Sequence, residues 1–192
     1  MFNHPGIVAV AGSRILSASS SALVVQISSE LAAHGSSFVV GCCSGTDAAL
    51  LSAVPRSIPP SMVRCLAAFS SNAMGAAPSS AVAQVFSFST CGGSVEWLAG
   101  GSLSLPLWIR LANRTKQVVH SANAGLLVFF SSPRSRGSFL ACRCAVSRGL
   151  PVLAFPIGFS DSELPVLGSG SWVPAMDENS YFWVKNQQDI LT

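Results

Sequence analysis

The chain has 192 residues, of which 49% are apolar and 10% charged, and its net charge is +3. This length suits one well-cored domain, so we expect a single domain over residues 1–192. No run approaches the ~18 uninterrupted apolar residues of a membrane span, and residues 1–6 lack the basic start of a secretory signal. These features argue against membrane and secreted proteins and predict a cytoplasmic protein, while the sparse charge favours a homo-oligomer.

The cysteines and histidines form no pattern of a metal or catalytic site. The six cysteines include no Cys-x-x-Cys pair, and no histidine stands at metal-ligand spacing. We expect these cysteines to be small core residues in a reducing compartment, with no metal and no cofactor. Histidine-assisted catalysis is not expected either, because the sequence has no Gly-x-Ser-x-Gly elbow.

Charge is divided unevenly along the chain. Residues 1–150 hold nine arginines and Lys116 against three acidic residues, whereas residues 151–192 hold Lys185 against five. Arginine suits phosphate recognition because its planar guanidinium donates two parallel hydrogen bonds. The first part of the chain is therefore the candidate region for an anionic ligand, unless the arginines only solvate the surface.

The first predicted unit is a strand, a loop and a helix. Ile7–Ala11 is a short apolar run, and Gly12–Arg14 follows it as a loop. Ser17–Ser21 offers cap residues for an amphipathic helix that reaches about His34. Phe38–Val40 then starts a second strand.

The second predicted loop, Gly41–Asp47, carries a Gly-x-x-x-Gly pattern and precedes an apolar helix, Ala48–Val54. Glycines with Ser44, Thr46 and Asp47 let backbone N–H groups approach an anion at a helix N-terminus. The alternative is structural, because glycine often ends a strand and Ser, Thr and Asp often cap helices. Asp47 is also the best-placed acid for catalysis, although helix capping is the simpler role.

A third strand is predicted over Met62–Phe69, and an irregular insertion over residues 70–106. Residues Val82–Ser89 alternate weakly between apolar and polar. The aromatic side chains in this stretch need burial, which argues against disorder. A flap or an oligomer contact is one account of the insertion, and an irregular surface loop is the other.

A helix is predicted over Leu107–His120, with Leu107, Leu111, Val118 and Val119 on its buried side. Arg110 and Arg114 are four residues apart and project from one face. They would meet an anion held at the edge of the sheet, or else form an exposed arginine pair.

The next segment predicts a strand over Gly125–Phe130, a polar loop over Ser131–Ser138, a helix over Phe139–Arg148 and a strand over Pro151–Phe155. Unbroken apolar runs joined by a helix indicate parallel strands covered on both faces. We therefore expect an α/β fold with a mostly parallel sheet, helices on both faces and ligands at the carboxyl ends of the strands.

Residues 159–192 are expected to form a C-terminal extension. Gly170–Pro174 is interpreted as a turn, and the aromatic tail Tyr181–Thr192 as a segment that packs on its own domain or a neighbour.

Three short motifs in this order resemble the Rossmann-like SLOG superfamily, which includes DprA/Smf proteins and LOG phosphoribohydrolases. They are Val10-Ala-Gly-Ser-Arg14, Val40-Gly-Cys-Cys-Ser-Gly-Thr-Asp47, and Ser135-Arg-Gly-Ser138 followed by Gly149-Leu-Pro-Val152. The resemblance covers about residues 6–158 without residues 70–106, and it implies a Rossmann-like, three-layer fold. It also implies a phosphate site formed by Gly12, Ser13, Arg14, Gly41, Gly45, Thr46, Asp47, Arg110, Arg114, Arg136, Gly137 and Ser138.

The chain departs from the LOG enzymes in one loop. Those enzymes carry a Pro-Gly-Gly-x-Gly-Thr-x-x-Glu loop with a catalytic glutamate, and Pro133–Ala141 here contains no acid. Our first hypothesis is therefore a binding protein for a nucleotide or a nucleotide-derived phosphate ligand. The alternatives are DprA-like binding of single-stranded DNA, a nucleotide N-glycosidic hydrolase that would rely on Asp47, and a self-assembling structural protein.

Overall fold

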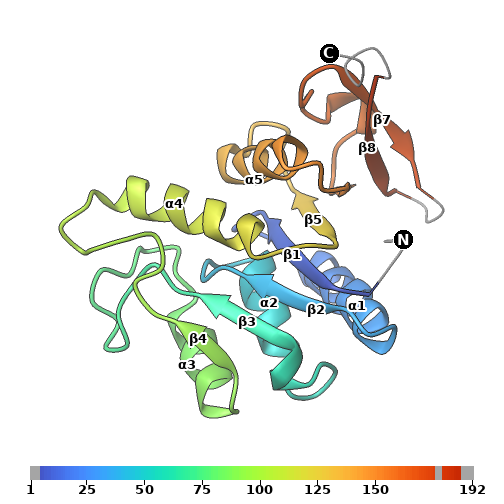
Figure 1. Ribbon diagram of the computed structural model, residues 1–192. Helices are drawn as coiled ribbons and strands as arrows, with labels where there is room; N and C mark the ends of the chain where they lie inside the picture. The colour runs from blue at the N-terminus through green and yellow to red at the C-terminus, as the bar shows by residue number, and fades with distance from the viewer. Residues whose placement is uncertain (1–4, 176–178, 187–192) are drawn as a thin grey trace.

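The computed structural model describes residues 5–175 and 179–186 (Figure 1). They form a mixed α/β fold around one 8-stranded sheet of order β4-β3-β2-β1-β5-β6-β8-β7. The strands from β4 to β6 run parallel to their neighbours, and β8 and β7 join antiparallel. The Rossmann-like class with a mostly parallel sheet, expected from the sequence, is confirmed.

The strands coincide with the apolar runs of the sequence, because a strand covered on both faces has no polar side. The central strand β5 is buried at every position. The bounds are β1 Ile7–Gly12, β2 Ser37–Val40, β3 Val63–Leu66, β4 Ser94–Glu96, β5 Gly125–Phe130, β6 Val152–Pro156, β7 Gly170–Pro174 and β8 Tyr181–Lys185.

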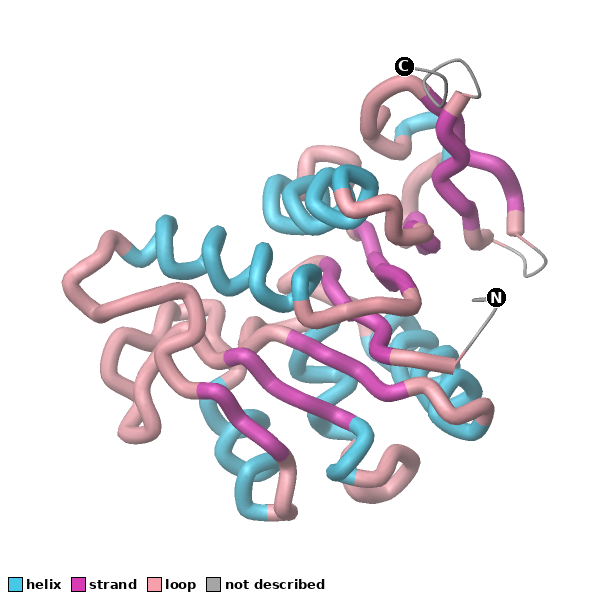
Figure 2. The backbone as a smooth tube through the Cα atoms, viewed as in Figure 1, coloured by secondary structure: helices cyan, strands magenta, loops and turns pink. Residues whose placement is uncertain are grey.

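Helices cover both faces of the sheet, which makes three layers (Figure 2). Side chains of α1, α2 and α3 share one apolar core with one face of the strands, and those of α4 and α5 share another with the opposite face. The bounds are α1 Ala18–Ala33, α2 Thr46–Ala53, α3 Val82–Thr90, α4 Leu107–His120 and α5 Arg136–Ser147. Among the described residues, no helix is both long enough and apolar enough to cross a membrane.

The helix predicted between Ser17 and His34 is confirmed as α1. The Ser17 hydroxyl caps it by accepting a hydrogen bond from the Ser20 N–H at 3.1 Å. Gly35 follows the helix with φ +86, a left-handed conformation that suits glycine and stops the helix. The C-terminal end of α1 then turns directly into β2.

The stretch 70–106 contains regular structure. Its alternating part, Val82–Ser89, lies in helix α3 and not in an extended segment, and β4 adds a parallel strand beside β3. Val85 and Phe88 of α3 are fully buried against the sheet, so the helix covers the end of the apolar face. The sequence periodicity of this segment is weak, so burial of these side chains against the sheet determines that the segment is helical.

The C-terminal extension also differs from its prediction. Gly170–Pro174, interpreted as a turn, is strand β7, and it pairs with β8 to form an antiparallel hairpin. Trp172 and Trp183 lie opposite each other in this hairpin, with ring centroids 5.2 Å apart in an edge-to-face arrangement. The aromatic part of the predicted tail therefore packs on its own domain, and residues 187–192 lie outside the described part of the chain.

Candidate functional site

The candidate pocket lies where the order of strands in the sheet changes direction, at β1 and β5. From β1 the chain builds outward through β2, β3 and β4, and it then returns to place β5 on the other side of β1. Crevices at such a switch point, beyond the carboxyl ends of the strands, are where ligands bind in open α/β sheets. A pocket of about 940 Å³ opens here between the loops after β1 and β5 and the first turns of α4.

The loop after β1 forms one wall of this pocket. Ser13 N–H donates to the Phe129 carbonyl at 2.9 Å, and the Ser13 hydroxyl accepts from Ser131 N–H at 2.7 Å. These bonds fasten the loops after β1 and β5 to each other. Arg14, next in the chain, is exposed and lines the pocket.

The loop after β5 and the start of α5 form the opposite wall. Ser135, Arg136 and Gly137 line the pocket at the N-terminus of a 12-residue helix, whose first turn has no acidic residue. Unpaired N–H groups and the helix dipole favour an anion there. Arg134 and Arg136 are exposed on the same wall.

Helix α4 supplies the third side. Trp108 is 72% exposed and lines the pocket, together with Leu111 and Thr115 from the next turns. An exposed tryptophan beside arginines offers a flat apolar surface at the edge of a positively charged wall. Ile15, 83% exposed, adds an apolar side chain from the first loop.

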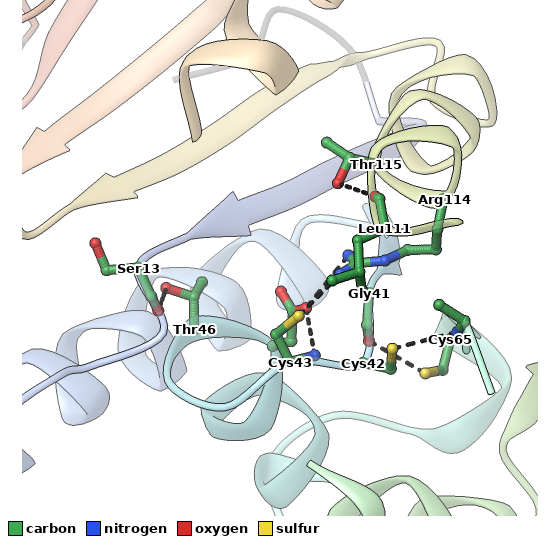
Figure 3. A network of polar contacts seen from close by, with 11 residues as sticks. Ser13, Gly41, Cys42, Cys43, Thr46, Cys65, Leu111, Arg114 and Thr115 are labelled. Atoms are coloured by element: carbon green, nitrogen blue, oxygen red, sulfur yellow. Dashed lines mark hydrogen bonds and ion pairs between the residues drawn. The ribbon is translucent and has the colours of Figure 1, made fainter. Parts of the chain in front are cut away.

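The segment Gly41–Asp47, which is the loop after β2 and the first two residues of α2, lies behind the pocket, under Arg114 (Figure 3). The Arg114 guanidinium donates to the Cys43 sulfur at 2.9 Å and lies 3.5 Å from the Asp47 carboxylate. Gly41 leaves the space for this side chain, because a Cβ there would stand 1.6 Å from Arg114 Nη1. Arg114 is only 7% exposed, and it lines the pocket from this buried position.

Burial shifts the titration of the groups around Arg114. It raises the pKa of Asp47 to about 7, although Arg114 and the hydrogen bond from Cys43 N–H act in the opposite direction. The pKa of Cys43 is lowered to about 5, mainly by a hydrogen bond with the Cys42 thiol and further by the charge of Arg114. Within the described residues, Arg114 Nε is buried without a hydrogen-bond acceptor.

The segment Gly41–Asp47 also holds the loop after β1 in place. Thr46 N–H donates to the Ser13 carbonyl at 3.0 Å, and Thr46 Oγ1 reaches the same oxygen at 3.3 Å. Gly45 has φ +72, and a Cβ there would stand 2.1 Å from that carbonyl oxygen. This close approach explains why a glycine is needed between β2 and α2.

The structure therefore divides the residues expected to bind a phosphate. It brings together around the pocket Gly12, Ser13, Arg14, Arg114, Arg136 and Gly137. Gly41, Gly45, Thr46 and Asp47 lie behind or beside the pocket, and Ser138 is buried with its hydroxyl 2.8 Å from that of Ser135. Ligand contacts of all these residues remain predictions.

Arg110 lies away from the pocket. Its guanidinium donates to the carbonyls of Ala68 and Gly75, and it is 5% exposed. The buried side of α4 consists of Arg110, Arg114, Val118 and Val119, whereas Leu107 and Leu111, expected to be buried, are only partly so. Backbone carbonyls and Asp47 provide the partners that allow the arginines to be inside.

The set of site residues expected from the sequence left out several that line the pocket: Ile15, Trp108, Thr115 and Arg134. The sequence does relate two of them, because Trp108 and Thr115 are seven residues apart and therefore lie on one face of the predicted helix. Arg134 stands in the predicted loop Ser131–Ser138 and could have been included by position alone.

No acidic residue is among those that line the pocket in the described part of the chain. Asp47 lies behind Gly41 and Arg114, and Glu96 pairs with Arg64 in the neighbouring strand β3, at the far edge of the sheet. No group of three His, Cys, Asp or Glu that could hold a metal occurs among the described residues. The pocket thus presents cationic, hydroxyl and apolar groups, which suit binding of an anion with an aromatic part.

Comparison with known proteins supports the fold. The chain matches no protein-family model, and no curated protein sequence matches it. Its structure is similar to that of DNA processing protein A from Helicobacter pylori, reported for its single-stranded DNA binding mode, with TM-score 0.60 and 18% identity over 82% of this chain and 68% of that one. It is also similar to DNA processing protein A (DprA) from Streptococcus pneumoniae, with TM-score 0.58 and 20% identity over 82% of this chain and 52% of that one. The fold is accordingly the Rossmann-like fold of DprA proteins, as the resemblance in the sequence implied.

Proposed function

We propose that the pocket at the carboxyl ends of β1 and β5 binds single-stranded nucleic acid. The observation that carries this proposal is the combination, around one pocket without an acidic residue, of exposed Arg14, Arg134 and Arg136 with exposed Trp108. Single-strand binding without sequence preference uses this combination, a cationic groove for the backbone and aromatic rings for the bases.

The volume of the pocket and the placement of its arginines fit this use. About 940 Å³ is at the upper end of ordinary ligand pockets, which leaves room for more than one nucleotide. Arginines on two opposite walls can contact successive phosphates, while Trp108 on α4 offers a stacking surface. The similar Helicobacter pylori protein, reported to bind single-stranded DNA, points in the same direction.

Fluorescence anisotropy of the purified chain with a labelled oligothymidylate of roughly 16 nucleotides tests the proposal. We expect saturable binding whose logarithmic salt dependence has a slope of about −2, because three exposed arginines displace counterions at about 0.7 each. Trp108→Ala should weaken binding by about 1–3 kcal/mol through lost stacking. Arg14→Ala with Arg136→Ala should weaken binding and flatten the salt slope.

Arg56→Ala is the matched control, because Arg56 is an exposed arginine in the connection between α2 and β3. This connection lies at the amino ends of the strands, opposite the pocket. It should leave affinity unchanged. Equal losses in Arg56→Ala and in the Arg14 and Arg136 double variant would show non-specific attraction and contradict the pocket as the site.

The second candidate is a mononucleotide, and the N-terminus of α5 favours it. Unpaired N–H groups there suit a terminal phosphate, which carries more charge than a phosphodiester. Competition separates the two candidates. A nucleoside monophosphate that displaces the oligonucleotide at a concentration near the oligonucleotide's own Kd would favour the mononucleotide, whereas single-strand binding predicts weak competition.

A further inference from the structure

The two edges of the sheet differ in how they are protected. The edge strand β4 has only three residues, and its Glu96 forms an ion pair with Arg64 of β3. The opposite edge strand β7 has five residues, Gly170-Ser-Trp-Val-Pro174, with no charge. Proteins normally protect an open edge with charges or by shortening it, because its free N–H and C=O groups pair with other strands.

The main-chain groups on the outer side of β7 can be identified from its pairing with β8. Ala175 N–H donates to the Ser180 carbonyl, and Asn186 N–H donates to the Ser169 carbonyl. Residues of β7 alternate in the direction of these groups, so Ser171 and Val173 face β8 like Ser169 and Ala175. The groups of Gly170, Trp172 and Pro174 therefore point outward, and among the described residues no strand pairs with them.

Proline fits this arrangement. Pro174 has no N–H, and its position is one where that group would point away from β8. The outer side of β7 thus offers donors at Gly170 and Trp172, and acceptors at Gly170, Trp172 and Pro174. The strand remains competent to pair on this side despite its proline.

We propose that β7 pairs antiparallel with β7 of a second copy of this chain, about a two-fold axis at Trp172. Trp172 would then exchange two hydrogen bonds with the partner's Trp172, and Gly170 N–H would donate to the carbonyl of the partner's Pro174. Pro174 lies at each end of the paired segment, so the hydrogen bond that it cannot donate is a terminal one, whose loss costs least. The outer groups of one strand therefore complement themselves, as a symmetric dimer requires.

The side chains of β7 agree with this pairing. Ser171 and Val173 lie on one face and are exposed, and pairing about Trp172 places each directly opposite the partner's other residue. Val173 is 43% exposed, and Val184 of the adjacent β8 is 49% exposed on the same face. Pairing brings these uncharged surfaces together across the axis. A second copy is favoured over a basic or acidic partner because the strand presents no charge.

Sedimentation velocity of the full chain over a range of concentrations tests the proposal. We expect a dimer for the unaltered chain. Ser171→Lys with Val173→Lys places like charges opposite each other at both contacts, and it should raise the dimer Kd more than 100-fold. Ser171→Glu with Val173→Lys places opposite charges at the same contacts and should restore the dimer.

Met74→Lys is the matched control, because Met74 is 58% exposed and lies between β3 and α3, at the other end of the strand order from β7. It should leave the dimer intact, and circular dichroism should show all variants folded, since the altered positions are exposed. A monomer at every concentration would overturn the proposal, including the case in which the chain's own residues cover this edge. A dimer unaffected by the double lysine variant would overturn it equally.

Discussion

The segments that follow β1 and β2 both contain glycine and serine, yet they face different surroundings. Gly12–Arg14 borders the pocket and ends in an exposed arginine. Gly41–Asp47 is largely buried and faces Arg114 and the carbonyl of Ser13. We refer to exposed Arg14, Arg134 and Arg136 as the rim, and to Gly41–Asp47 with Arg114 as the floor.

The comparison shows that a glycine-rich loop can make room for protein atoms as well as for a ligand. Gly41 admits the Arg114 guanidinium and Gly45 admits the Ser13 carbonyl, whereas Gly137 on the pocket wall has no atom within 4 Å of an added Cβ. Floor residues should therefore control stability and rim residues should control binding. The following variants separate these two roles.

The largest effect is expected for Asp47→Ala in the floor. It removes the acceptor of Cys43 N–H, bonded at 2.8 Å, and one of the anionic partners of buried Arg114. Orphaned buried donors and charges are costly, so we expect a loss of about 2–4 kcal/mol in the free energy of unfolding. Urea denaturation measures it. A loss below about 0.5 kcal/mol, the usual range for surface substitutions, would show that the floor does not depend on this carboxyl.

The pH dependence of stability sharpens the role of Asp47. Burial raises its pKa from 3.8 to about 7, so the folded chain binds this proton more tightly than the unfolded chain. The resulting contribution to stability is complete below pH 3.8 and is lost as the pH rises through about 7. The free energy of unfolding of the unaltered chain minus that of Asp47→Asn should fall across this window. A constant difference would contradict a raised pKa.

Gly45→Ala and Gly137→Ala compare the two kinds of glycine. Gly45 has φ +72 and no room beside the Ser13 carbonyl, so alanine should cost roughly 1–3 kcal/mol of stability. Gly137 lies in the first turn of α5 in open space, and alanine there should stabilise by about 0.4–1 kcal/mol. Thermal unfolding of both variants measures the contrast, and a similar loss in both would argue against it.

The smallest effect on stability is expected at the rim. Arg14→Ala with Arg136→Ala alters two exposed side chains and should change the free energy of unfolding by less than about 0.5 kcal/mol. The same double variant should lose oligonucleotide affinity. If it unfolds the chain, the division between rim and floor is wrong.

The parallel strands were predictable because burial on both faces leaves unbroken apolar runs. The helix over Leu107–His120 was predicted with the bounds that the structure has, and the cap candidates Ser17–Ser21 include Ser17, which caps α1. These elements are encoded locally, by periodicity and by caps.

The rest depends on contacts between distant segments. Arg110 of α4 donates hydrogen bonds to the carbonyls of the loop 68–75, and Ser44 N–H donates to the Ser79 carbonyl at 2.8 Å. Because these partners are distant in sequence, the residues of the loops around 70 and 79 do not by themselves indicate the conformation. Arginine is rarely buried, and nothing in α4 alone indicates that Asp47 and backbone carbonyls would accept its two arginines. The place of the candidate site, at loops along the carboxyl edge of the sheet, was therefore predictable, while the assignment of each residue to rim or floor required the three-dimensional structure.

The bond from Ser131 N–H to the Ser13 hydroxyl joins residues 118 positions apart. During synthesis from the N-terminus, the first wall of the pocket leaves the ribosome long before the second exists. Domains fold as units in such circumstances, and contacts this distant in sequence slow the search for the native state. A nascent chain that ends before β5 carries Arg14 without its counterpart Arg136. The proposed binding should therefore require a chain that has been synthesised beyond the first turns of α5.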